Sequence, residues 1–170
     1  MSSNEQKKYV FKPYNESFPK LFATEKKRIS SYFSVTSDIQ HVGSTAVPGL
    51  GGKGIIDIAI AVNKKDTETA SKQLQELGYE FRPQFSTDDR LYFVIHLPDA
   101  EEGTRRYHVH LTYPESSDWK NLIGFRNYLI CHPTKAEEYA EIKRNAAIEA
   151  NQDGEKYRKL KEHIFKDAHD

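Results

Sequence analysis

The residues best suited to chemistry stand in one glycine-rich stretch between two apolar runs. Residues 41–60 contain five glycines and one proline. Glycine allows the positive φ angles and the close backbone approach that a loop around a phosphate or another anion requires. Lys53 follows two of these glycines and can neutralise a phosphate as a point charge. The stretch is not a Walker A loop, because Lys53 is followed by Gly54 rather than by Ser or Thr.

Asp57 lies inside the second apolar run, residues 55–62, whose β-branched composition is typical of a buried strand. A buried carboxylate without a partner is costly, so this acid needs an explanation. Alternation along a strand puts Asp57, Ala59 and Ala61 on one face. Because the two alanines are small, that face leaves room for a ligand beside the carboxylate.

Two histidines, His108 and His110, stand two positions apart on a predicted strand and therefore point the same way. Their spacing suits Zn²⁺, Mn²⁺ or Fe²⁺ better than Mg²⁺, and with Asp57 they would form a two-histidine, one-carboxylate metal site if the strands are adjacent. The alternative is a pair of polar cleft residues that bond to Asp57 or to each other without a metal. Arg106 shares the face of His108 and is a candidate for binding phosphate or for an ion pair with Asp57.

The elements that must position these residues alternate between helical and strand patterns. We predict strands over residues 39–42, 55–62, 79–83, 90–97 and 105–112, helices over 15–33 and 66–77, and helices through the last third of the chain. The last of these helices turns Tyr157, Leu160 and Ile164 inward. Three successive segments with one polar face predict an open sheet whose apolar side is covered by helices, leaving the polar side for a cleft.

Composition excludes several classes of protein. The 170 residues carry a formal net charge of zero, which gives no strong nucleic-acid signal. No run approaches 18 apolar residues, so we expect no membrane span. The N-terminus lacks the apolar core of a signal peptide, and the one cysteine, Cys131, excludes an internal disulfide. We therefore expect a cytoplasmic protein.

The string from His41 to Ile58 resembles the GrpB family, and more loosely the opening of the nucleotidyltransferase superfamily. Later residues support the same resemblance in order: His108, His110, residues 125–129, His132, Pro133, Tyr139, Lys143, Tyr157 and Lys161. The resemblance covers roughly residues 10–167. It implies one α/β (α+β) domain over residues 1–170, with a nucleotidyltransferase-like mixed sheet and helices on one face. The α/β core would span residues 9–113 and a C-terminal helical subdomain residues 116–168.

The resemblance also implies roles for particular residues. In nucleotidyltransferases the loop after the first strand holds the phosphates, which assigns phosphate binding to Gly43 and Ser44, and strand carboxylates hold divalent metals, which makes Asp57 the first acid. Asp57 and Ser44 are thus the predicted catalytic residues, and Asp57, His108 and His110 the predicted ligands of Mg²⁺, Mn²⁺ or Zn²⁺. The second acid should stand at position 59, where this chain has Ala59, which leaves one carboxylate for the metal.

Three cations complete the predicted site. Lys53, Arg106 and Arg126 are expected to bind phosphate, since Arg126 lies on an otherwise apolar helical face where a charge is either paired or directed into a cleft. Lys143 lies on a similar face. Ser44 acting as a covalent nucleophile would need a base, for which His41 is a nominal candidate.

These residues predict a protein that binds a small-molecule nucleotide or another phosphoanion, and possible nucleotidyl transfer to an unidentified acceptor. Two alternatives stay open. One is a metal-dependent phosphoesterase or hydrolase using Asp57, His108 and His110. The other is a binding module that kept the fold and lost catalysis with the second acid.

Overall fold

The computed structural model describes residues 13–149, with side chains described as far as residue 145. The predicted final helix around Tyr157, Leu160 and Ile164 lies outside this range. The helices and strands in chain order are α2 (Ser17–Tyr32), β1 (Ser37–Val42), β2 (Ile56–Val62), α3 (Thr67–Glu76), β3 (Glu80–Phe81), β4 (Leu91–Asp99), β5 (Gly103–Thr112), α4 (Ser117–Cys131) and α5 (Pro133–Glu149).

The five strands form one mixed sheet in the order β1-β2-β5-β4-β3. Strands β2 and β5 run parallel, and the other neighbouring strands are antiparallel. The parallel pair places β5, which comes late in the sequence, directly beside β2 in the centre. The central position of this pair brings Asp57 and the predicted histidine strand together.

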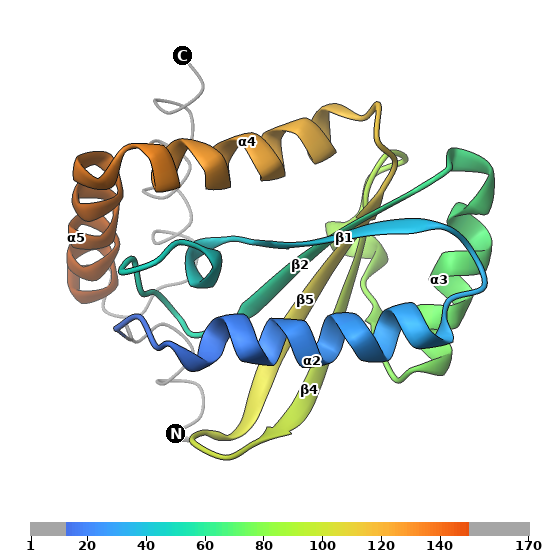
Figure 1. The fold of residues 1–170 in the computed structure, drawn as a ribbon, viewed down its shortest axis with the longest axis horizontal. Coiled ribbons are helices and arrows are strands. Elements are labelled where there is room, and N and C mark those ends of the chain that lie inside the picture. Colours follow the sequence, from blue (N-terminus) through green and yellow to red (C-terminus); the bar gives the residue numbers. More distant parts are fainter. Residues whose placement is uncertain (1–12, 150–170) are drawn as a thin grey trace.

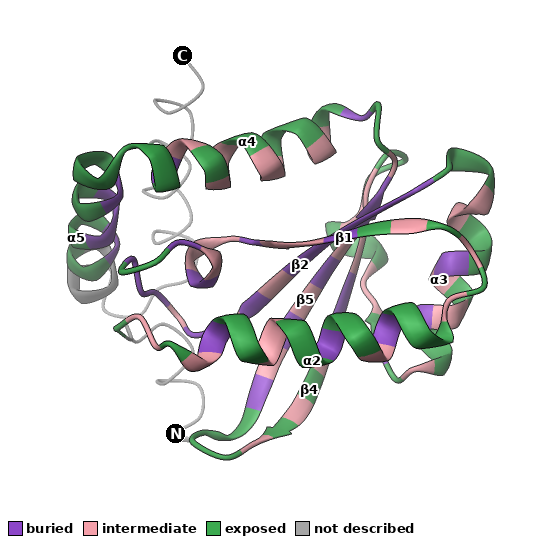
Figure 2. Cartoon of the chain, in the orientation of Figure 1, coloured by how far each residue is buried: buried purple, intermediate pink, exposed green. Residues whose placement is uncertain are grey.

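Helices α2 and α3 cover the apolar face of the sheet (Figure 1). Their apolar side chains pack on alternate residues of the strands, because successive strand residues point to opposite faces. The core contains Phe18, Ile29, Ile56, Ile58, Ile60, Leu74, Phe93, Val109 and Leu111. In Figure 2 the strands are largely buried, while the outward sides of α2 and α3 are exposed. This alternation confirms the predicted α+β class with a mixed sheet.

The C-terminal helices lie on the other side of the sheet. Helix α4 lies beside strand β1, and α5 follows it at a steep angle beside the loop that joins β1 to β2 (Figure 1). A second, smaller core holds α5 against this loop through Val47, Leu50, Leu129, Ala136, Tyr139 and Ala140. The loop is therefore enclosed between the sheet and the last described helix.

The strands keep their predicted positions to within two residues at each end, and the third strand is the one most shortened. Strand β3 contains only Glu80 and Phe81, because a 3-10 turn begins at Pro83, which has no N–H to continue the ladder. None of the described helices is both long enough and apolar enough to cross a membrane.

Candidate functional site

The polar face of the sheet carries the predicted strand residues side by side. The parallel register puts Asp57 beside His108 and Ala59 beside His110. On the far side of β5, Tyr92 of β4 stands opposite His110. We use the name polar face for the side of the sheet on which these residues lie.

Asp57 is the centre of this face. Its Oδ1 lies 3.3 Å from Nδ1 of His108 and 3.6 Å from Nε2 of His110. Burial alone would raise the pKa of the Asp57 carboxyl, but its contacts with His108 and then with His110 hold this pKa well below the usual range. Asp57 is consequently ionised, and its partners are the two histidines rather than Arg106.

The tautomer of His110 follows from Arg90. A guanidinium only donates hydrogen bonds, and one nitrogen of Arg90 lies 3.0 Å from Nδ1 of His110, so this Nδ1 must be the acceptor. The proton of the neutral ring therefore sits on Nε2, the nitrogen that faces Asp57. Arg90 was not among the predicted site residues, since nothing in its local sequence shows that it reaches β5.

His108 is held between Asp57 and Tyr92. Its Nδ1 lies 2.8 Å from the Tyr92 hydroxyl as well as 3.3 Å from Oδ1 of Asp57. Burial lowers the pKa of His108, although the neighbouring Asp57 opposes this effect, so the ring is neutral near pH 7. The other ring nitrogen, Nε2, is buried and has no hydrogen-bond partner among the described residues.

These side chains, as they stand, do not fit a bound metal. Nδ1 of His108 and Nε2 of His110 face the same oxygen of Asp57. This is the arrangement of two ring nitrogens around one hydrogen-bond acceptor. Within residues 13–149 no three His, Cys, Asp or Glu side chains are arranged to hold an ion. The place of the second acid is taken by Ala59, which is fully buried. The divalent metal stays a prediction.

The glycine-rich loop, residues 43–55, begins directly after β1. Gly43 has a φ of 76° and opens a short 3-10 turn over Ser44–Ala46. Thr45, in this turn, is fully buried and donates a hydrogen bond to the carbonyl of Ile55 at 2.9 Å, which ties the two ends of the loop together. At the far end Arg105 donates a bond of 2.8 Å to the carbonyl of Gly54. The loop is thus fastened to the sheet at both ends.

Ser44 and Lys143 converge on Gly52 inside this loop. A Cβ atom placed on Gly52 would lie 2.5 Å from Oγ of Ser44 and 2.7 Å from Nζ of Lys143. Lys143 comes from α5, is only 2% exposed, and places its ammonium 5.2 Å from the centre of the Tyr139 ring. Glycine at position 52 leaves the space in which a hydroxyl and an ammonium meet the loop backbone.

Lys143 was noted in the sequence but not placed among the site residues. The available signal was its position one helical turn after Tyr139 and Ala140, on a face that is otherwise apolar. A lysine in that position is either paired or directed into a site. Only the packing of α5 against the loop shows which loop residue it reaches.

The structure separates the other predicted cations. Lys53 lies within the loop and is partly buried. Arg106 lies on the polar face, next to His96 of β4. Arg126 donates bonds of 3.0 Å to the side chain of Gln40 and to the carbonyl of His41, so it fastens α4 to β1. Phosphate binding by these three residues stays a prediction.

His41 is not placed to serve Ser44. It faces the apolar side of the sheet, where its ring stacks on the ring of Phe22 with 4.8 Å between the ring centres. Its Nε2 lies 3.0 Å from the Thr45 hydroxyl, whose proton is already given to Ile55, so Nε2 is the donor. Burial lowers the pKa of His41 to about 4, with Asp57 opposing this effect and Arg126 adding to it. His41 therefore supports the loop as a neutral residue.

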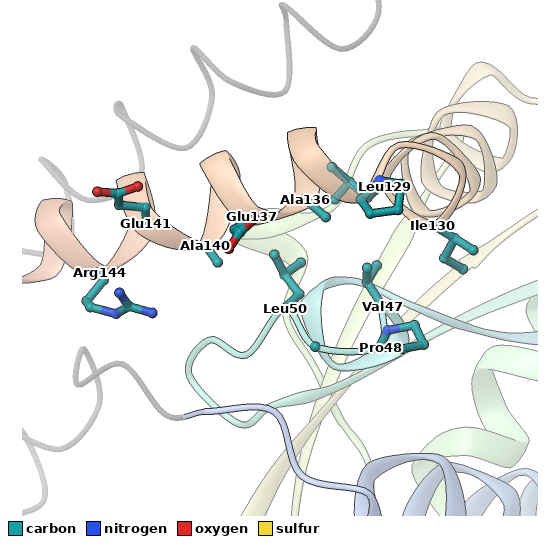
Figure 3. Close-up of a pocket in the computed structure, with 12 residues that line it drawn as sticks. Val47, Pro48, Leu50, Leu129, Ile130, Ala136, Glu137, Ala140, Glu141 and Arg144 are labelled. Atoms are coloured by element: carbon teal, nitrogen blue, oxygen red, sulfur yellow. The ribbon is translucent and has the colours of Figure 1, made fainter.

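A groove lies on the other side of the loop, between residues 47–50 and helices α4 and α5 (Figure 3). It encloses about 530 Å³ and is lined mainly by apolar side chains, with Glu137, Glu141 and Arg144 along α5. In the close-up Val47, Pro48 and Leu50 lie across from Ala136 and Ala140. The sequence did not predict this groove, because it arises only where the loop meets α5.

The fold and the site define a class: an α+β domain with a mixed sheet, in which a glycine-rich loop joins the edge strand β1 to its neighbour β2 and lies against an ionised strand aspartate. The family model described as GrpB protein matches residues 8–170. The chain belongs to the GrpB family, as its loop string suggested.

Relatives support this assignment. The chain is 34% identical over 154 residues to UPF0157 protein PA4798 of Pseudomonas aeruginosa, covering 89% of this chain and 62% of that protein. It is 31% identical over 147 residues to the glutamate-rich protein GrpB of Alkalihalophilus pseudofirmus, covering 85% and 84%. The crystal structure of the conserved protein GrpB from Enterococcus faecalis superposes with a TM-score of 0.74 at 22% identity, covering 95% of this chain and 100% of that one.

Proposed function

We propose that this protein binds a phosphoanion, most simply the phosphates of a nucleotide, in the glycine-rich loop. The observation that supports this function is the convergence of the Ser44 hydroxyl and the Lys143 ammonium on Gly52. A hydroxyl, an ammonium and the N–H groups of a glycine-rich loop are the donors with which proteins hold phosphate oxygens.

The burial of Lys143 adds to this proposal. Lys143 is 2% exposed, so its ammonium lies in a site of low dielectric constant, where its attraction to an anion or an electron-rich ring is stronger than in water. The Tyr139 ring offers a cation–π contact, which contributes about 1–2 kcal/mol. A phosphate beside Ser44 would add a full negative charge in a site of low dielectric constant, where a charge-assisted bond is strong.

The polar face around Asp57 does not favour two-metal nucleotidyl transfer. That reaction uses at least two carboxylates to hold the metals, and Ala59 occupies the second position with no exposed surface. The hydrolase alternative would need Asp57, His108 and His110 to surround an ion, whereas the rings face one oxygen of Asp57. Binding without two-metal transfer is therefore the function we put forward.

Isothermal titration calorimetry and thermal shift test this proposal. The ligands are the nucleoside triphosphates, CoA and dephospho-CoA, and each ligand is measured with Mg²⁺ and with EDTA. A ligand at 100 times its dissociation constant should stabilise the protein by about 2.7 kcal/mol. Lys143→Gln and Ser44→Ala should each weaken binding about tenfold or more, because each removes a donor to a charged group. Lys135→Gln is the matched control, since Lys135 lies on the same helix but is exposed and pairs with Glu138.

The outcomes distinguish phosphoanion binding in the loop from a metal-dependent reaction at Asp57. If binding survives in EDTA and in Asp57→Asn but is lost in Lys143→Gln, the proposal stands. If binding needs a metal and disappears in Asp57→Asn, a metal-dependent reaction is favoured instead. Equal affinity of the wild type and a folded Lys143→Gln variant would overturn the loop site.

A further inference from the structure

The polar face carries a second group of cations that the loop site does not use. Arg106 of β5 is paired in the sheet register with His96 of β4. Arg82, just after β3, donates its backbone N–H to the carbonyl of Tyr92 and lies on the same face, since Glu80 pairs with Val94. Three adjacent strands thus bring two arginines and a histidine to one place.

We infer that Arg106, His96 and Arg82 form a second anion-binding subsite, which takes a phosphate ester group beside His108. This subsite is separate from the loop, so the inference does not depend on the proposed function. Its ligand group belongs either to a second molecule or to the far end of the molecule held in the loop.

Arg106 differs sharply from its neighbour Arg105. The Arg105 guanidinium is buried and fully engaged, with Asp99 at 2.9 and 3.1 Å and the carbonyl of Gly54 at 2.8 Å. The Nε of Arg106 is also buried, yet it has no hydrogen-bond partner among the described residues. A buried charged donor without a partner is costly, and its persistence indicates a ligand that completes it.

The nearby carboxylates are already engaged. Glu80 lies 2.9 Å from Nε of Arg82 and is largely exposed, and Asp57 faces the two histidines. Burial lowers the pKa of His96, and the charges of Arg106 and Arg82 lower it further. Positive charges on one face of the sheet repel one another, and a bound anion would relieve that repulsion.

His108 supplies a second buried atom without a partner. Its Nε2 lies on the same face as Arg106, two residues further along β5, while its Nδ1 is engaged by Tyr92 and Asp57. A phosphate ester carries oxygens that accept from Arg106, and in its protonated form it also donates. A phosphate ester can therefore hydrogen-bond to both Nε of Arg106 and Nε2 of His108, whichever ring nitrogen of His108 holds the proton.

The test is a titration of the full chain with inorganic phosphate, followed by NMR of the histidine rings. The His96→Gln spectrum assigns the His96 signal. In the wild type this signal should move along a saturable curve, and Arg106→Gln should weaken the fitted affinity about tenfold or more. Arg106→Lys should retain part of the affinity, which separates loss of charge from loss of structure. Lys65→Gln is the control, because Lys65 is an exposed lysine away from this face.

Each outcome decides the question. A saturable shift that Arg106→Gln loses, and that Lys143→Gln and Lys65→Gln retain, supports the second subsite, even if no nucleotide binds the loop. No saturable shift of His96, or equal affinity in a folded Arg106→Gln variant, overturns it. A shift that Lys143→Gln also loses would mean one continuous site and overturn the separate subsite. If Arg106→Gln and Lys143→Gln each weaken the binding of tripolyphosphate, while only Arg106→Gln loses the binding of inorganic phosphate, then one molecule reaches both subsites.

Discussion

Gly43 lies directly against the carboxylate of Asp57. A Cβ atom placed on Gly43 would stand 2.5 Å from Oδ2 and 3.0 Å from Cβ of Asp57, while Oδ1 faces His108 at 3.3 Å. One oxygen of the acid is therefore covered by the start of the loop, and the other is given to the histidines. The loop conformation and the orientation of Asp57 depend on each other.

Gly43→Ala tests this relationship. Position 43 combines a φ of 76° with a ψ of −174°, a region that glycine occupies almost alone, and the new methyl group would collide with Asp57. We expect a loss of about 3 kcal/mol in the free energy of unfolding, together with shifted ring signals of His108 and His110.

Gly49→Ala is the control for that variant. Gly49 also has a positive φ, 81°, but nothing lies within 4 Å of its added Cβ. It should lose only the backbone strain, about 1–2 kcal/mol, and leave the histidine signals unchanged. Equal effects of the two variants in urea denaturation and in NMR would show that contact with Asp57 does not matter.

Ala59→Asp restores the acid that the transferase pattern requires. Ala59 is fully buried and faces the same side as Asp57, so an added carboxylate without a cation should lower the free energy of unfolding by about 2 kcal/mol. If the cleft is a degenerate transferase site, Mg²⁺ should recover this loss and strengthen nucleotide binding. Ala59→Asn is the uncharged control. A folded Ala59→Asp protein whose nucleotide affinity in Mg²⁺ is unchanged would count against that geometry.

His41 should make stability fall in mild acid. Its pKa is about 4 in the folded protein and about 6.5 when unfolded, so below pH 6.5 the unfolded chain takes up a proton that the folded chain refuses. The free energy of unfolding therefore falls between about pH 6.5 and pH 4, by at most about 3 kcal/mol from this residue. His108, whose pKa is also lowered, acts in the same direction.

The variant His41→Gln isolates this effect, because glutamine can still donate to Thr45 but does not titrate. Urea denaturation at several pH values should show a shallower decline for the variant than for the wild type. Parallel curves would assign the acid sensitivity to other groups.

Arg105 should control the far end of the glycine-rich loop. Arg105 is 4% exposed, and its guanidinium links Asp99 to the carbonyl of Gly54. Arg105→Gln leaves a buried carboxylate unpaired and should lower the free energy of unfolding by about 3–5 kcal/mol. Hydrogen exchange in residues 43–55 should become faster.

Asp99→Asn provides the comparison for this variant, since it removes the ion pair but keeps the bond to Gly54. At matched global stability, the amides of residues 43–55 should exchange more slowly in Asp99→Asn than in Arg105→Gln. If loop exchange is the same in both variants, the bond to Gly54 does not hold the loop.

The sequence by itself determined the local features of this protein. Alternation predicted the strands around Asp57 and His108 and their polar face, and the glycines of residues 43–54 predicted a loop with positive φ angles. The loop string also identified the family. These properties are readable because strand alternation and glycine conformation depend on neighbouring residues.

Only the tertiary structure decided which distant side chains meet. The parallel register of β2 and β5 put His108 beside Asp57, and the packing of α5 brought Lys143 to Gly52. It also placed His41 beside Thr45 and Arg126 beside the backbone of β1. Contacts between residues so far apart in the chain arise from how whole helices and strands pack, and no local pattern encodes that packing.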